Sequence, residues 1–197
     1  MSESINRFIP VGDIRDSHEI IVDAPASVVF EAAAHFDIES VHAVRAIAWF
    51  RAKILGAPHS PMHGGLFEAM KQLGWVPLAS TERRELVMGA VAKVAGELKI
   101  EAISTDGFLS AAGPDTVKMA WSVQAEPMTE TITRLRTQTR VMACDGEARR
   151  EFAAYWRRFS PGVPLIRRLL LRAVKREAER QFKAQATRLT SAATHAH

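Results

Sequence analysis

The clearest pattern along the chain is the alternation of side chains between Ile132 and Ala143. One face of this segment carries Leu135, Thr137, Thr139, Val141 and Ala143. A period of two with many β-branched residues predicts a half-buried strand. Asp145 then stands where a helix N-cap is expected, because its carboxylate can accept hydrogen bonds from the free amides of a first helical turn. We therefore predict a helix from Glu147 to Phe159, capped by Asp145.

A second helix is predicted from Pro164 to Leu189, after Ser160-Pro161-Gly162 interrupts the first. Apolar residues recur in it at steps of three or four. They are Ile166, Leu170, Val174, Ala178, Phe182, Ala186 and Leu189. At a rise of ~1.5 Å per residue, this helix is roughly 35 to 40 Å long. An amphipathic helix of this kind must cover an apolar surface.

The N-terminal part of the chain predicts several short elements. Residues 1–12 are expected to be loosely held. A strand over Ser17–Asp23 ends at Ala24-Pro25, and Pro25 suits the first turn of the helix that follows. The predicted helices of this part cover Ser27–Phe36, Ser40–Leu55 and Leu66–Leu73.

From Trp75 onward the pattern changes to short strands that are separated by turn residues. The predicted strands cover Trp75–Ser80, Arg84–Val91, Leu98–Ile103, Phe108–Ala112 and Val117–Ala125. One strand, two short helices, a run of antiparallel strands and a long final helix make an α+β domain. We predict one domain over residues 13–190, in which a curved antiparallel sheet wraps around the C-terminal helix, and a flexible tail at 191–197.

Composition narrows the class of protein. A chain of 197 residues favours one domain that is large enough to enclose a cavity. The single cysteine, Cys144, excludes an intramolecular disulfide. No apolar run approaches the ~20 residues of a membrane-spanning helix, and Met1–Val11 has no signal-like stretch. We therefore expect a cytoplasmic protein.

The charges are distributed unevenly along the chain. Between Arg149 and Arg188 there are twelve Lys or Arg against three Glu, a net charge of +9. The rest of the chain holds 14 basic and 19 acidic residues, a net charge of −5. The basic helix allows three interpretations: a solvated face, a contact with an anionic membrane surface, or a nucleic-acid contact. No recognition motif accompanies the charge, so nucleic acid is the least favoured partner.

Several segments resemble the helix-grip superfamily, also called START-like or SRPBCC. It includes START lipid-transfer domains, the birch-pollen-allergen group and the polyketide cyclase/dehydrase group. The opening HEIIVDAPASVVFEAAAHF looks like the family's first strand, Ala-Pro and short helix. RELVMGAV, TRVMACD, FAAYW and LIRRLLLRAVKREAE resemble segments of bacterial members. The resemblance rests on the order of elements and extends over Asp13–Leu189. This chain departs from the family pattern by an insertion over Asp37–Gly74, which we interpret as a helical lid or an enlarged wall.

The resemblance implies a deep cavity between the sheet and the last helix, filled by a hydrophobic or amphiphilic small molecule. We assign its wall to residues that the strand alternation and the helical stripe place on inward faces, with Thr hydroxyls among apolar side chains. They are Phe67, Met88, Met119, Trp121, Val123, Leu135, Thr137, Thr139, Val141, Leu170 and Val174. The alternative is that these side chains only pack against one another as core.

Two functions are consistent with the predicted cavity. The first is a carrier or sensor of a lipid, quinone or polyketide-like compound. The second is a polyketide cyclase/dehydrase-like enzyme that uses the same cavity. Tyr155, Arg140 and Thr139 are its candidates for proton transfer, and His18 is a further group that could move a proton. Two or more buried, mutually bonded ionisable groups at the cavity would favour the enzyme, and their scarcity in the pattern favours the carrier.

No cofactor or metal is predicted. His59 and His63 share a loop, but no third ligand stands at a helpful spacing. Cys144 has no recognisable catalytic context. The chain also lacks the glycine-rich phosphate-binding motifs and the GxSxG motif, so nucleotide-binding and serine-hydrolase functions have no support.

Overall fold

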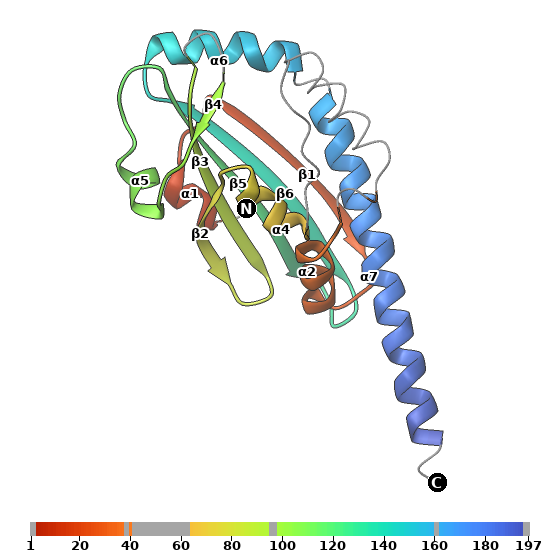
Figure 1. Ribbon diagram of the computed structural model, residues 1–197. Helices are drawn as coiled ribbons and strands as arrows, with labels where there is room; N and C mark the ends of the chain where they lie inside the picture. The colour runs from red at the N-terminus through yellow and green to blue at the C-terminus, as the bar shows by residue number, and fades with distance from the viewer. Residues whose placement is uncertain (1–2, 38–39, 41–63, 95–97, 160–161, 195–197) are drawn as a thin grey trace.

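The computed structural model describes residues 3–37, 40, 64–94, 98–159 and 162–194, and the arrangement of their elements is shown in Figure 1. The helices are α1 (Glu3–Phe8), α2 (Ala26–Ala34), α4 (Leu66–Gln72), α5 (Thr105–Ser110), α6 (Gly146–Phe159) and α7 (Val163–Thr194). The strands are β1 (Ile14–Val22), β2 (Val76–Thr81), β3 (Glu85–Lys93), β4 (Lys99–Glu101), β5 (Thr116–Pro127) and β6 (Thr133–Ala143).

All strand pairs described are antiparallel. The order across the sheet is β1-β6-β5-β3-β2, and the short β4 pairs with β3. The register of β5 and β6 runs from Val117 opposite Ala143 to Pro127 opposite Thr133, so odd-numbered residues face odd-numbered residues. Because side chains alternate along a strand, the odd residues of both strands share one face of the sheet. We call this the inner face.

The inner face is covered by α2, α4 and α7. Apolar side chains of these helices form one buried cluster with Trp121, Val123 and Leu135 of the sheet. In Figure 1, α7 runs along the β1 edge, and α6 lies across one end of the strands. The described architecture is therefore α+β, with an antiparallel sheet against a long C-terminal helix, as the sequence predicts.

The opposite, outer face is covered by α1 and α5. Ile5 and Ile9 are 0% exposed and pack with Phe108, Val87 and other residues of the sheet. Arg140 of β6 reaches the same segment, and its Nη1 donates to the carbonyl oxygen of Ile9 at 2.9 Å. The prediction that residues 1–12 are loosely held is therefore wrong for Ile5 of α1 and for Ile9, which follows the helix. These two isoleucines match an apolar surface that exists only when the sheet has formed.

The segment predicted as a strand over Phe108–Ala112 is a second correction, because residues 108–110 belong to α5 and the next two are in no strand. The hydroxyl of Ser104 accepts from the amide of Gly107 at 3.0 Å and caps this helix. Phe108 is fully buried against β3, where Gly89 leaves room for its ring: a Cβ on Gly89 would lie 2.8 Å from it. The apolar pattern of this segment therefore belongs to a capped helical turn and not to a strand.

The inserted segment is described only in part. The helix predicted over Ser40–Leu55 lies almost entirely outside the described residues, as do His59 and His63. The helix predicted over Leu66–Leu73 is confirmed as α4, whose Leu66 is buried in the inner cluster. This part of the insertion therefore adds to the wall over the inner face.

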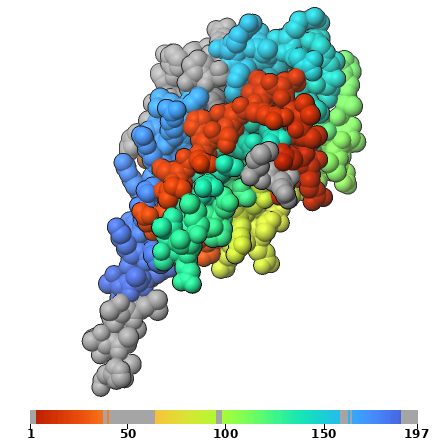
Figure 2. All heavy atoms as spheres, turned by 180° about the vertical axis from the view of Figure 1, so that it is seen from behind, coloured from red at the N-terminus to blue at the C-terminus, as the bar shows by residue number. Residues whose placement is uncertain are grey.

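Helix α7 continues to Thr194, beyond Leu189 where the pattern predicts its end and into the predicted tail. Figure 2 shows from behind how α7 lies beside β1 and then extends past the sheet. Residues 183–188 are all exposed, so the apolar stripe is no longer buried after Phe182. No helix within the described ranges has the length and apolar character needed to cross a membrane.

Ile9→Ala tests the packing of the N-terminal segment. Since Ile9 is fully buried, we expect its truncation to lower the free energy of unfolding by about 2 to 5 kcal/mol. Val11→Ala is the control, because Val11 is 73% exposed and should change stability by less than about 0.5 kcal/mol. Denaturant unfolding measures both. Equal, small effects would show that this segment does not pack on the sheet in solution.

The cap of α6 is expected to make stability depend on pH. The Asp145 carboxylate accepts from the amides of Ala148 and Asp115, each at 2.8 Å. The Ala148 amide is the largest cause that lowers the pKa of Asp145 below its ordinary value of 3.8. The folded pKa is depressed, so the contribution is present above pH 3.8 and is lost as pH falls through the folded pKa.

Asp145→Asn preserves an N-cap side chain but removes the titrating group. We expect its stability to resemble the parent protein near neutral pH and to fall less steeply below pH 3.8. Thermal unfolding followed over a pH series measures this difference. Parallel curves for the two proteins would contradict the role of the Asp145 charge.

Candidate functional site

A cavity of about 60 Å³ lies between the inner face of the sheet and α7. Its walls come from four parts of the chain: α2, the start of α4, strands β5 and β6, and the first half of α7. The lining residues are Ala33, Leu66, Trp121, Val123, Leu135, Thr137, Arg167, Leu170, Leu171 and Val174. All but Thr137 and Arg167 are apolar or aromatic, which is the usual lining of a small-molecule site.

The orientation of Trp121 is fixed by contacts on two sides. Its indole Nε1 donates to the hydroxyl of Thr137 at 2.8 Å, on the neighbouring strand β6. Phe67 of α4 meets the indole edge-on, with ring centroids 6.2 Å apart, and Phe30 of α2 packs on Phe67 at 5.5 Å. The hydrogen bond satisfies the one polar group of the buried indole. Trp121 therefore forms a rigid wall of the cavity.

Arg167 is the one charged residue among the described side chains that line the cavity. It stands on the buried stripe of α7, because Leu171, Val174 and Ala178 follow it at steps of four, seven and eleven residues. Its guanidinium meets a polar cluster on the sheet. The Nε lies 3.1 Å from Asp16 Oδ2, and Nη2 donates to the hydroxyl of Thr139.

His18 completes this cluster, which we call the Asp16 cluster: Asp16, His18, Thr139 and Arg167. The Nδ1 of His18 lies 3.3 Å from Asp16 Oδ1. The Asp16, His18 and Arg167 side chains are 18%, 15% and 13% exposed. Burial lowers the pKa of Arg167, and the charge of Asp16 partly opposes this shift. The Asp16 carboxylate is therefore the group that compensates the guanidinium charge in this mostly buried site.

One donor of Arg167 remains unused. Nη1 is buried and has no hydrogen-bond partner among the residues that the structure describes. A buried donor on a charged group costs free energy when it is left unpaired. The cavity therefore combines apolar walls with one available N–H donor.

Comparison with known proteins gave matches among solved structures alone. No family model matches the chain, and no curated protein matches it in sequence. The matching structures include aromatase/cyclases and other helix-grip proteins. ZhuI aromatase/cyclase from Streptomyces sp. R1128 is 18% identical with a TM-score of 0.32, over 85% of this chain and 94% of that one.

Two further structures are similar to a comparable extent. A conserved protein from Geobacillus kaustophilus is 10% identical with a TM-score of 0.40, over 85% of this chain and 96% of that one. The di-domain ARO/CYC BexL from the BE-7585A biosynthetic pathway is 15% identical with a TM-score of 0.30, over 84% of this chain and 46% of that one. Similarity at this level transfers no ligand and no activity.

The fold is identified from the arrangement of this chain's own strands and helices. The described strands form one antiparallel sheet, and the inner face of that sheet packs against the long C-terminal helix. The chain has a helix-grip fold. The cavity lies where a helix-grip fold brings the sheet and its last helix together.

The helix-grip arrangement separates the predicted wall residues into three groups. Those that line the cavity are Trp121, Val123, Leu135, Thr137, Leu170 and Val174. Those that lie beside it are Met88, fully buried in the same cluster, Phe67 against Trp121, and Thr139 bonded to Arg167. Met119 and Val141 belong to a different apolar cluster, where Phe152 of α6 covers the far end of the sheet.

The sequence reasoning missed Arg167 and Asp16 as members of the site. Arg167 was counted with the basic face of the last helix, although its spacing from Leu171 and Val174 places it on the buried stripe. Asp16 precedes His18 and Ile20 on one face of an alternating segment. These two periodicities are the signals that could have found the pair.

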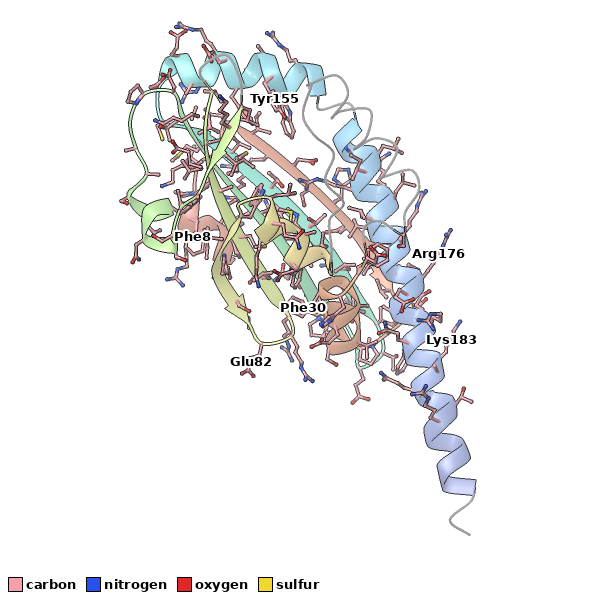
Figure 3. The ribbon with its side chains drawn as sticks, in the orientation of Figure 1. Phe8, Phe30, Glu82, Tyr155, Arg176 and Lys183 are labelled. Atoms are coloured by element: carbon pink, nitrogen blue, oxygen red, sulfur yellow. The ribbon has the colours of Figure 1, made fainter. Side chains whose placement is uncertain are left out.

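The predicted candidates for proton transfer do not converge. Arg140 is on the outer face, where it binds the carbonyl oxygen of Ile9. Tyr155 lies on α6 beside Phe152, and Figure 3 places it at the opposite end of the sheet from Phe30. Thr139 remains near the cavity through Arg167. Cys144 is half-buried, and burial raises the pKa of its thiol, which disfavours the reactive thiolate.

The contact between Asp16 and Arg167 can be measured by a double-mutant cycle. Because both side chains are mostly buried, removal of one leaves the other uncompensated. We expect Asp16→Asn and Arg167→Met to show a coupling energy of about 1 to 3 kcal/mol in denaturant unfolding.

The pair Glu19 and Arg136 is the control, since it joins the same edge strand, β1, to β6 on the outer face. Its side chains are 46% and 24% exposed, so Glu19→Gln and Arg136→Met should couple by at most about 1 kcal/mol. A coupling at Asp16 no larger than this control would contradict a distinct inner cluster.

Proposed function

We propose that the protein binds a hydrophobic or amphiphilic small molecule in the cavity between the sheet and α7, as a carrier or sensor. The ligand class includes lipids, quinones and polyketide-like compounds. The observation that carries the proposal is the cavity itself, with its nearly continuous apolar lining. Concave apolar sites with few polar groups are typical of small-molecule binding.

The size of the cavity limits how the ligand can enter. Its volume of about 60 Å³ is well below the roughly 300 to 1,000 Å³ of sites that bury drug-sized molecules. The cavity as described accepts a small group or one end of a longer molecule. A longer ligand requires lining side chains to move, and Leu66 of α4 and Leu170 of α7 are among the wall residues that helices contribute.

An enzyme of the cyclase/dehydrase kind is the second candidate, and the Asp16 cluster favours it. Asp16 lies 3.3 Å from His18 and 3.1 Å from Arg167, and such contacts between mostly buried ionisable side chains are expected of an acid-base site. Of these three, however, Arg167 is the residue that lines the described cavity. A guanidinium stays charged and is a poor proton donor or acceptor. Binding is therefore the better supported role.

A membrane-surface contact through the basic helix stays a prediction. Arg176 and Lys183 project from α7 away from the sheet (Figure 3). Other cations of the helix are paired within it: Lys175 lies 2.9 Å from Glu179, and Arg180 lies 2.6 Å from Glu177. These pairs are what a solvated helix face also contains, so they favour neither interpretation.

Native mass spectrometry on protein purified without detergent tests the binding function. We expect a reproducible apolar adduct that denaturing extraction releases and identifies. Val174→Phe should abolish it, because Val174 lines the cavity, is 3% exposed, and a phenyl ring there occupies the ligand space. Val11→Phe is the matched control at a position 73% exposed, and it should retain the adduct.

The same experiment separates the two candidate functions. A bare mass, with no uptake of fatty acid, quinone or an apolar dye, would contradict the binding function. An extracted compound that returns unchanged after incubation with excess protein supports the carrier or sensor. Conversion of that compound, lost in His18→Gln with binding retained, would instead establish the enzyme.

A further inference from the structure

We infer that the cavity recognises an organic acid: a small apolar body that bears one carboxylate, which accepts a hydrogen bond from Arg167 Nη1. This inference rests on the proposed binding function and specifies its ligand class. The elements that support it are an unused donor, a guanidinium near a helix N-terminus and an apolar wall.

The unused donor belongs to a residue whose other contacts hold it in place. Arg167 Nε faces Asp16, and Nη2 donates to Thr139, so the guanidinium plane is fixed from the side of the sheet. Nη1 then remains as a buried donor on a side chain that lines the cavity. A ligand oxygen placed there removes the cost of an unpaired charged donor. A hydrocarbon ligand would leave this cost in place.

The charge around the cavity favours an anion over a neutral oxygen. Of the five cations between Val163 and Arg176, Arg167 is the one that lines the described cavity; Lys175 pairs with Glu179, and the other three are exposed. Asp16 contacts one of these charges, Arg167. The N-terminus of a helix adds partial positive charge, and Arg167 stands about one turn inside α7. A carboxylate at Nη1 therefore meets the guanidinium charge and the partial positive charge of the helix N-terminus, and a cationic ligand is disfavoured.

The rest of the wall determines the body of the acid. The hydroxyl of Thr137 already accepts from Trp121, and the remaining lining residues are apolar. A chain or small ring therefore gains from burial, whereas additional polar groups would lack partners. The volume of about 60 Å³ favours short acids.

Calorimetric titration of two matched ligand series tests the inference. The probes are straight-chain carboxylates of roughly four to ten carbons and the primary alcohols of equal length, a size range chosen to bracket the small cavity. We expect the intact protein to bind each acid about tenfold or more tightly than its alcohol, as a charge-assisted hydrogen bond implies. Arg167→Met should remove this preference, because it weakens acid binding far more than alcohol binding. Arg168→Met, an exposed neighbour on α7, should preserve both.

Asp16→Asn provides a variant that acts in the opposite direction. It removes the negative charge next to Arg167, so the preference for each acid over its alcohol should increase. A purely structural role of Asp16 would weaken both series together. This variant also keeps the inference testable if Arg167→Met does not fold.

The outcomes distinguish the inference from the function on which it rests. Equal binding of acids and alcohols, unchanged in Arg167→Met, would overturn the inference and leave the binding function in place. Binding of neither series would overturn the binding function, and the organic-acid inference with it.

Discussion

The structure depends on one constraint: strands β3 and β5 at the centre of the sheet are buried on both faces, and both faces must be covered there. Strand β5 is buried along almost its whole length, on inward and outward residues alike. A sheet of this kind is stable only between two layers. Helices α2, α4 and α7 supply the inner layer, and α1 and α5 supply the outer one. The N-terminal segment is therefore part of the fold, even though it is remote in sequence from the strands it covers.

The cavity is a consequence of how the inner layer meets the sheet. The indole of Trp121 is held by Thr137 and Phe67, and the helix brings Leu171 and Val174 over it. Arg167 of the same helix also lies at this apolar contact. A charge at such a position is costly unless it is compensated, and Asp16 on the edge strand supplies the compensation. The result is a site that is polar at one wall only.

Local patterns were sufficient for most of the fold. The alternation that ends at Ala143, the cap at Asp145 and the long apolar stripe of the last helix all predict elements that the structure contains. The two failures have a common cause. Residues 1–12 and the segment around Phe108 are short and apolar without a clear period, and what they pack against comes from distant strands. Their burial is a long-range property that no local pattern carries.

The sequence by itself determined the class of the fold, the strand faces and much of the apolar wall, because side-chain periodicity is a local property of strands and helices. Only the tertiary structure decided which charged side chains enter the site. Asp16 and Arg167 are separated by most of the chain, and their contact depends on the rotation of α7 about its axis and on the β1–β6 pairing. Arg140, a sequence candidate for proton transfer, lies on the outer face and not at the cavity, because strand register assigns the face of every residue.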